Sequence, residues 1–360
     1  MRSKYLLPLS LLLLAACGDD PEDAYIDPTE EPAETIDVEF TPQMADSIWN
    51  LYLPAANFVD APETIPTDSL DPDYEEFVET WLGTETTRDV VIMFNGSDAT
   101  VTFKDTSKKT KEAVKVTKEG AHVVIRNEKL TDGVADGRAR MNYILRGKTE
   151  DGSVRIYSNK KFMVTLDSVS ITNPSGSAIN AQKSFEKKRM FLNLQKGTQN
   201  YLCDAEVYTD TVPGEDEKGT LFSEGKLILC GEGELHVAGR RTHAIASDDR
   251  IRIHSGITLA VDSAHKDGIH TKDALVMTGG KVSVYARKDA IQTADSLENK
   301  GLTLQGGLLQ LCAKRAITSY PVLFRGTRFC AITKEEFLPT AGDDYTVKEE
   351  PGYLIYYSEN

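Results

Sequence analysis

The chain has 360 residues, and its 56 acidic and 41 basic residues give a net charge of −15. The acidic excess is confined to residues 17–87, which hold 20 acidic residues and no Lys or Arg. Only Arg2 and Lys4 are charged before Cys17, so 39 basic and 36 acidic residues remain beyond residue 87. The body is therefore near neutral, and without aromatic residues interleaved among its basic ones it disfavours a nucleic-acid partner.

The N-terminus predicts export. Two basic residues precede the apolar run Tyr5–Leu14, which is too short to span a bilayer as a mature helix and ends in Leu-Ala-Ala before Cys17. This order resembles the lipobox of bacterial lipoproteins, which implies a signal peptide over residues 1–16 and acylation of Cys17; the alternative is an ordinary cleaved signal. The acidic run Gly18–Asp23 resembles the tags that send lipoproteins of Bacteroidota to the cell surface. We therefore expect outer-membrane lipid as a partner and a surface-exposed location.

Residues 17–87 predict a tether. Pro, Glu and Asp dominate them and leave few apolar side chains to bury, so we expect a largely disordered acidic spacer. An amphipathic element over Met44–Tyr52 interrupts this pattern. A short helix or strand that packs on the body explains it better than a helix that binds a partner.

The body, residues 88–335, predicts an all-β solenoid. Small-then-aliphatic motifs place anchor aliphatics 24, 24, 22 and 26 residues apart, at Leu221, Ile245, Ile269, Ile291 and Ile317. Apolar residues alternate at period two within each unit, as in Ile251 and Ile253, and glycines such as Gly256 mark sharp corners. Three short strands and three corners per coil make a parallel β-helix whose coils stack about 4.8 Å apart.

Both ends of this solenoid need covers. Strands over Asp89–Asn127 are expected to lead into the first coil or cap it as an N-terminal β region. At the other end, residues 336–360 are expected to form a C-terminal cap whose last strand is Gly352–Ser358, because a terminal coil exposes unpaired backbone.

Equivalent positions of successive coils form columns. Hydroxyls stand two places after the anchors and predict a hydrogen-bonded ladder: Ser223, Ser247, Thr271, Thr293 and Ser319. Four places after the anchors, Asp249, Asp273 and Asp295 fit turn positions better than metal binding.

The column two places before the anchors carries His243, Asp267, Asp289 and Arg315. Carboxylates of neighbouring coils at roughly 5 Å repel by about 3 kcal/mol at an effective dielectric near 20. Either a Ca²⁺ ion or a flanking ion-pair ladder, with Arg315 beside Asp289 and His243 beside Asp267, must offset this repulsion.

Recurrent "DGI" and "DAI" anchors, followed by strands such as "TGGKVSV", resemble a bacterial carbohydrate-binding domain family. "LNLQKGTQNYLCD" and "KGTLFSEGKLILCGEGELHVAG" resemble its preceding segments, and the resemblance covers about residues 89–331. It implies a right-handed single-stranded parallel β-helix, binding of polygalacturonate and bound calcium, as in the family's characterised clostridial relative. By matching positions it implies Asp204, Asp267 and Asp289 as Ca²⁺ ligands. His243 and Arg315 depart from the pattern and lower the expected number of ions.

Basic residues recur at equivalent corners and predict stripes along the solenoid that follow a linear polyanion; the alternative is a solvated face of mixed charges. We assign glycan binding to Arg240, Arg241, Lys266, Arg287, Lys288, Lys314 and Arg315. The histidines between His236 and His270 fit surface packing better than a transition-metal site, because no His-x-x-x-His spacing is present.

We expect a non-catalytic protein that binds an acidic, pectic polysaccharide. The alternatives are a structural or adhesive surface protein, or a lyase or hydrolase. The Asp248-Asp249 pair alone is weak support for an enzyme, because turn chemistry explains it. Four cysteines follow Cys17. Cys203 and Cys230 lie about one coil apart, so a disulfide between them and free thiols are both open, as they are for Cys312 and Cys330.

Overall fold

The computed structural model describes residues 37–54, 58, 60, 87–105, 114–127, 140–158, 161–183, 189–295, 301–336 and 345–358. The chain divides into two units, residues 1–37 and 38–360, and the description below concerns the second. The predicted signal peptide, the predicted lipidation site Cys17 and the acidic run after it lie outside the described residues. No described helix is both long and apolar enough to cross a membrane.

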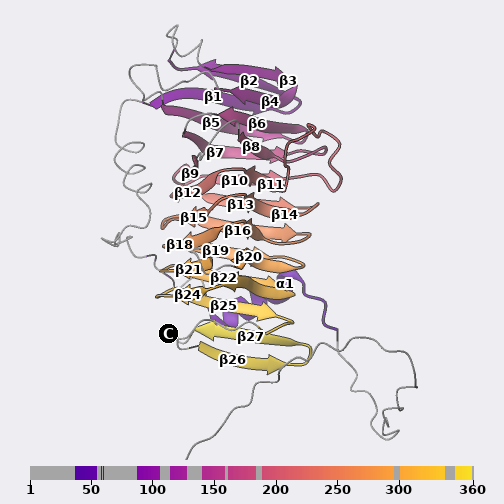
Figure 1. Cartoon of the computed structure of the whole chain (residues 1–360), viewed down its shortest axis with the longest axis vertical. Helices are drawn as coiled ribbons and strands as arrows, with labels where there is room; N and C mark the ends of the chain where they lie inside the picture. Colours follow the sequence, from indigo (N-terminus) through magenta and orange to yellow (C-terminus); the bar gives the residue numbers. More distant parts are fainter. Residues whose placement is uncertain are drawn as a thin grey trace, which may run out of the picture. The chain divides into compact units, whose positions relative to one another are not determined.

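The body is all-β, and its parallel strands stack into ladders that run along its length (Figure 1). The first ladder, here called ladder 1, runs through β4 (Ala121–Arg126), β6 (Gly152–Ser158), β8 (Ile179–Lys183), β11 (Gly219–Ser223), β14 (His243–Ser247), β17 (Ile269–Thr271), β20 (Asp289–Asp295) and β23 (Arg315–Tyr320).

Two further ladders complete each turn of the chain. Ladder 2 contains β9 (Arg189–Leu194), β12 (Lys226–Gly231), β15 (Ile251–Ile253), β18 (Ala274–Met277), β21 (Gly301–Leu304) and β24 (Val322–Phe324). Ladder 3 contains β10 (Gln199–Cys203), β13 (Glu234–Gly239), β16 (Thr258–Ala264), β19 (Lys281–Tyr285), β22 (Leu308–Ala313) and β25 (Arg328–Thr333). The chain enters ladders 1, 2 and 3 in turn, as in β11, β12 and β13, so three successive strands form one coil. This arrangement makes the fold β-helix-like.

The anchor aliphatics occupy one column, as predicted. Backbone register pairs Leu221 with Ile245, Ile245 with Ile269, Ile269 with Ile291 and Ile291 with Ile317. Four of these side chains are at most 1% exposed, and Ile317, in the last coil, is 7% exposed. Because side chains alternate between the two faces of a strand, the period-two pattern directs every second residue into one continuous core.

Glycines form the corner between ladders 2 and 3. Gly231 and Gly256 have φ of +99° and +85°, in the left-handed region that side chains with a Cβ avoid. A Cβ on Gly231 would also lie 2.2 Å from the carbonyl oxygen of Leu194 in the preceding coil. These corners therefore need glycine both for backbone conformation and for close stacking of the coils.

Long strands join the ladders at the N-terminal end. The first half of β7 (Phe162–Thr172) pairs with β9, and its second half pairs with β10. β5 (Arg140–Thr149) and β1 (Thr87–Asn95) continue this sheet in parallel. Two strands then pair antiparallel at the end of the stack, β2 (Asp98–Phe103) with β1 and β3 (Lys115–Glu119) with β4.

At the C-terminal end, β27 (Tyr353–Ser358) pairs antiparallel with β25 and with β26 (Tyr345–Glu350). The strand expected over Gly352–Ser358 thus covers the last coil and satisfies backbone groups that would otherwise be exposed.

One helix, α1 (Pro42–Tyr52), belongs to the folded unit although it lies within the predicted tether. The Thr41 hydroxyl caps it by accepting a hydrogen bond from the Met44 N–H, and Pro42 suits the first turn. Trp49 is 6% exposed, packs in a cluster with Cys312, Cys330 and Ile332, and donates its indole N–H to the Leu311 carbonyl at 3.3 Å. The amphipathic segment is therefore a helix that packs on the body, because its apolar face completes this cluster.

The four cysteines described are free thiols. Cys203 ends a strand of ladder 3, whereas Cys230 lies in ladder 2, where it pairs in register with Asn193. Their separation of about one coil in sequence therefore does not bring them together, and the disulfide considered from their spacing is not formed. Cys312 and Cys330 are buried beneath α1.

Candidate functional site

The column His243, Asp267, Asp289 and Arg315 lies where the chain enters ladder 1. His243, Asp289 and Arg315 open their strands, and Asp289 pairs in register with Arg315. The Asp267 carbonyl accepts from the Ala244 N–H, and the Asp289 carbonyl accepts from the Gly268 N–H, so the four residues occupy successive coils. The side chains of both aspartates are fully buried. The predicted column is therefore real, and it places two charges inside the protein.

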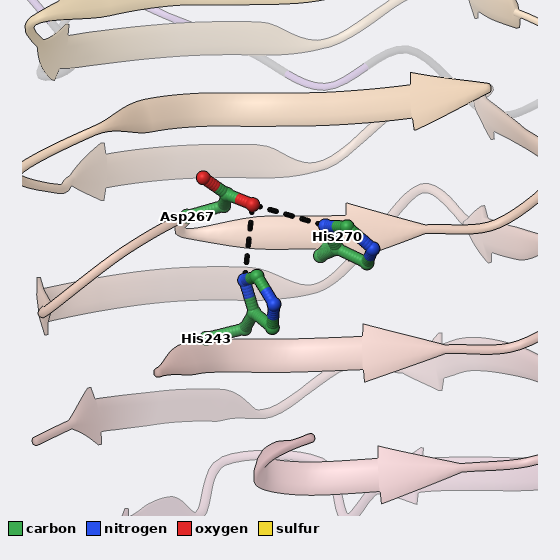
Figure 2. Close-up of side chains that lie close together, drawn as sticks. All are labelled: His243, Asp267 and His270. Carbon is green, nitrogen blue, oxygen red and sulfur yellow. Dashed lines mark hydrogen bonds and ion pairs between the residues drawn. The ribbon is translucent and has the colours of Figure 1, made fainter. Parts of the chain in front are cut away.

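Two histidines contact the Asp267 carboxylate (Figure 2). His270 Nδ1 forms a hydrogen bond of 2.9 Å with Oδ2, and His243 Nδ1 lies 3.1 Å from the same oxygen. The two rings stack with centroids 4.1 Å apart. Burial opposes ionisation of Asp267, but the two imidazoles outweigh it and hold the pKa of this carboxyl well below its usual range. Burial lowers the pKa of His243 although Asp267 opposes that shift.

Basic side chains surround Asp289. The Arg315 guanidinium binds both carboxylate oxygens, with Nη2 2.8 Å from Oδ2, and the Thr318 hydroxyl donates to Oδ1 at 3.1 Å. Lys288 Nζ lies 3.2 Å from Asp289 Oδ2 and 3.4 Å from Asp267 Oδ1. The ammonium of Lys288 thus sits between the two carboxylates and screens their repulsion.

This donor set fits calcium poorly. Ca²⁺ takes six to eight oxygen ligands, whereas the groups against this acid pair are an ammonium, a guanidinium and two imidazoles. The observed contacts are those of the ion-pair ladder, one of the two arrangements that the sequence allows. Calcium at Asp267 and Asp289 stays a prediction, and any calcium would have to displace Lys288.

Asp204, the third predicted ligand, belongs to a different environment. It follows β10 at the end of a ladder 3 strand, where its carboxylate accepts from the Tyr208 hydroxyl and the Arg240 N–H, both at 2.6 Å. Burial is the main cause that raises the pKa of Asp204. Among the described residues, Asp204 is not in the cluster of ligand groups that contains Asp267. The structure therefore brings Asp267 and Asp289 to one site and leaves Asp204 at another.

The predicted basic residues gather at the corner between ladders 3 and 1. Backbone hydrogen bonds of 3.0 Å join Lys288 to Lys266 and Lys334 to Lys314, and Arg315 bonds to Lys288 at 2.9 Å, so lysines follow one another in successive coils. The exposed members of the predicted set are Arg240, Arg241, Lys266, Arg287, Lys288 and Lys314, whereas Arg315 is partly buried. The Arg241 guanidinium also stacks 4.2 Å from the Tyr208 ring centroid. We call Lys266, Lys288 and Lys314 the lysine column.

The hydroxyl column bonds mainly to backbone at the corners. Ser247 donates to the Gly225 carbonyl at 2.9 Å, and Thr271 donates to the Asp249 carbonyl. Thr293 and Ser319 are the described pair that bonds hydroxyl to hydroxyl. The column therefore stabilises corners more than it forms a chain of hydroxyls. A corner carbonyl can accept a second hydrogen bond, as the Asp249 carbonyl does from the Thr271 hydroxyl and the Asp273 N–H.

Asp248, weighed as a hydrolytic acid, has a structural partner. Both of its oxygens accept from Lys218 Nζ, at 2.6 and 2.7 Å. Its neighbour Asp249 lies at a turn, where the Asp249 carbonyl accepts from the Asp273 N–H of the next coil.

Sequence reasoning did not single out His243 and His270 as partners of one carboxylate. The signal that could have found them is the coil period itself: His243 precedes Asp267 by 24 residues, one coil, and His270 follows it by three. A second missed feature is the exposed ring of Tyr201, which stacks on His236 with centroids 4.9 Å apart. His236 in turn contacts Asp262 through Nδ1 and Glu234 through Nε2, each at 3.0 Å.

Comparison with known proteins gives the class of protein to which these stacked coils and this basic corner belong. The model of the family described as "carbohydrate-binding domain-containing protein" matches residues 113–335, and the chain belongs to this family. A relative of the same description from Acetivibrio thermocellus is 29% identical over 117 residues, which are 32% of this chain and 40% of the relative. The chain thus matches less than half the length of that relative.

A solved structure supports the fold. It is titled as a gadolinium derivative of the polysaccharide lyase-like protein from C. thermocellum, and it aligns with a TM-score of 0.50 at 18% identity. The alignment covers 68% of this chain and 94% of the solved one. At this identity the likeness concerns the fold alone.

Proposed function

We propose that this protein is a surface-anchored, non-catalytic carbohydrate-binding lipoprotein that recognises an acidic, polygalacturonate-like polysaccharide through the basic corner of a right-handed parallel β-helix. Membership of a carbohydrate-binding family supports the carbohydrate as ligand. The lipobox-like sequence before Cys17 supports acylation and attachment to the outer membrane. The lysine column is the observation that favours an acidic ligand over a neutral one.

The lysine column has the geometry that a linear polyanion needs. Its side chains are exposed and recur once per coil, at the strand spacing of about 4.8 Å. Charges at a regular short interval attract a chain of carboxylates more strongly than the same charges scattered over a surface. Arg240, Arg241 and Arg287 flank the lysine column at the same corner and extend the basic surface.

Part of this positive charge is balanced by the protein itself. Lys288 contacts the two buried aspartates, and Lys314 Nζ lies 2.8 Å from the partly exposed Glu335. Lys266 and Arg287 form no ion pair among the described residues, so their charges are the ones most available to a ligand. We expect affinity to depend on Lys266 and Arg287 more than on Lys288.

The contacts of the acidic side chains favour binding over cleavage. A hydrolase needs two carboxylates free to act as acid and base across the glycosidic bond. Here Asp248 is held by Lys218, and Asp289 is held by Arg315 and Lys288. A lyase remains the alternative to test, because the solved neighbour is titled lyase-like. A structural or adhesive surface protein is the other alternative.

Affinity electrophoresis tests the proposal. The full-length protein is run in native gels that contain polygalacturonate or a neutral glycan, each with calcium or with a chelator. We expect retardation by polygalacturonate only, and a loss of it when Lys266 and Arg287 are both replaced by Ala. Lys196→Ala is the matched control, because Lys196 is also exposed but pairs with Glu232 at 2.6 Å.

The same samples are assayed for unsaturated products and new reducing ends. Product formation would support the alternative that the protein is a lyase or a hydrolase. Retardation in no acidic glycan would overturn glycan binding and leave the structural alternative.

A further inference from the structure

Three ligand atoms of different residues converge on one point beside ladder 1. One ligand atom from each of His243, Asp267 and His270 lies within 4.8 Å of the other two. The Nδ1 atoms of His243 and His270 lie 3.1 and 2.9 Å from Asp267 Oδ2. Figure 2 shows both rings turning Nδ1 toward the same carboxylate oxygen, His243 from β14 and His270 from β17 of the next coil. His243 and His270 belong to paired strands, and the Asp267 carbonyl accepts a hydrogen bond from the Ala244 N–H, so the backbone holds the three residues together.

We propose that His243, Asp267 and His270 form a binding site for a divalent transition-metal ion of the zinc class, with further coordination positions left for water or a ligand oxygen. The inference is independent of glycan binding.

The distances suit such an ion. Zinc takes nitrogen and oxygen ligands at about 2.0–2.2 Å, and in a tetrahedral site such ligands lie about 3.4 Å apart. The two nitrogens lie 3.1 and 2.9 Å from Asp267 Oδ2. Movements of a few tenths of an ångström, within the reach of side-chain rotation, would admit the ion.

Unsatisfied polar atoms mark the same place. Asp267 is fully buried, and its Oδ1 has only an ion-pair contact, with Lys288 Nζ at 3.4 Å. The buried His243 Nδ1 likewise meets Asp267 Oδ2 at 3.1 Å without the geometry of a hydrogen bond. The Asp267 carboxylate is therefore the protein group that faces His243 Nδ1. A metal ion would take the Nδ1 lone pair of each imidazole, with each ring proton carried on Nε2. Burial without full satisfaction is uncommon and calls for such an explanation.

The donors select the class of metal. Two imidazoles and one carboxylate suit Zn²⁺, Ni²⁺ or Cu²⁺, whereas Ca²⁺ and Mg²⁺ require mostly oxygen donors. Three protein ligands leave the coordination shell incomplete, and water or an oxygen of another molecule completes it. His243 and His270 are 13% and 23% exposed, so solvent reaches their rings.

Lys288 acts against the ion. Its ammonium lies 3.4 Å from Asp267 Oδ1 and repels any cation bound beside that carboxylate. Replacement of Lys288 by Met should therefore tighten metal binding, although the substitution removes a partner of the buried acids. An increase in affinity upon loss of a neighbouring side chain is a result that a purely structural cluster does not produce.

His236 provides a matched control. It also contacts two carboxylates, but Asp262 meets its Nδ1 and Glu234 meets its Nε2, on opposite sides of the ring. These atoms cannot converge on one ion. Zinc binding should therefore survive His236→Gln.

The experiment is calorimetric titration of the full-length protein, without a histidine tag and after treatment with a chelator, with Zn²⁺ and separately with Ca²⁺. We expect one equivalent of Zn²⁺ per chain, with affinity at least about tenfold lower in His243→Gln and in His270→Gln, unchanged in His236→Gln and higher in Lys288→Met. Circular dichroism confirms that each variant is folded.

Titration with Co²⁺ identifies the ligands. Nitrogen and oxygen coordination gives d–d bands without the sulfur-to-cobalt charge-transfer band that binding by Cys203 would give. Absence of zinc binding, binding that survives loss of both His243 and His270, or a thiolate spectrum would each overturn the inference.

Discussion

The Arg315–Asp289 pair offers a quantitative test of the ion-pair ladder. Asp289 is fully buried, and Arg315, 36% exposed, binds both of its oxygens. Replacing Arg315 with Met removes two charge-assisted hydrogen bonds and leaves a buried carboxylate with Lys288 Nζ at 3.2 Å and the Thr318 hydroxyl. Breaking a buried pair typically costs about 3–5 kcal/mol. Because Arg315 is partly exposed and Lys288 remains, we expect the free energy of unfolding to fall by about 2–3 kcal/mol.

Urea denaturation followed by circular dichroism measures this loss. Lys314→Met is the control in the adjacent position, since Lys314 and Glu335 are 58% and 43% exposed and solvent screens their attraction. The double variant Asp289→Asn/Arg315→Met should be more stable than Arg315→Met alone, because the neutral amide removes the unbalanced charge. An Arg315→Met variant that loses no more than Lys314→Met would refute the assignment of charge balance to this pair.

Three further outcomes are expected. If Lys288 and Arg315 suffice to balance the acid pair, calcium leaves the melting temperature unchanged; a calcium-dependent rise that disappears in Asp267→Asn and Asp289→Asn would instead establish a calcium site. The hydrogen bond with Asp262 raises the pKa of His236 above 6.5 against an opposing effect of burial. Its contribution to stability is therefore complete below about pH 6.5 and is lost as pH rises through the folded-state pKa, so denaturant midpoints of wild type and His236→Gln should converge at high pH. Trp49→Ala should cost about 3–5 kcal/mol through lost burial, seen as faster proteolysis around α1, and no change in cleavage would contradict the packing of that helix.

The order and spacing of residues within the coils made much of the fold predictable. Alternation of apolar residues is a local property, and the nearly constant spacing of anchors such as Ile245 and Ile269 predicted their pairing in one column. The same spacing placed His243, Asp267, Asp289 and Arg315 in successive coils, because the register that pairs the anchors of two parallel strands also pairs the residues near those anchors. Helix α1 was visible as an amphipathic segment, but its partners in the last coils were not.

The side-chain contacts of the site were less predictable. Asp204 matched the position of a family ligand, yet it binds Tyr208 and the Arg240 N–H away from the acid pair. Lys288 was assigned to glycan binding, whereas its ammonium lies between two buried carboxylates. Asp204 meets a tyrosine four residues along the chain and a backbone N–H of the next coil, and the long side chain of Lys288 reaches carboxylates of two coils. Sequence spacing specifies neither contact.

The sequence alone predicts a coiled β protein with a basic corner and an acidic tether, because the order of the residues contains the charge distribution, the strand period and the coil period. The tertiary structure decided how the buried charges are balanced. Asp267 meets two imidazoles and an ammonium only after folding brings His243 and Lys288 from the adjacent coils, and His270 from its own coil, within about 3.5 Å of one carboxylate. Such a meeting depends on distances between coils and on side-chain rotamers, which no linear pattern contains.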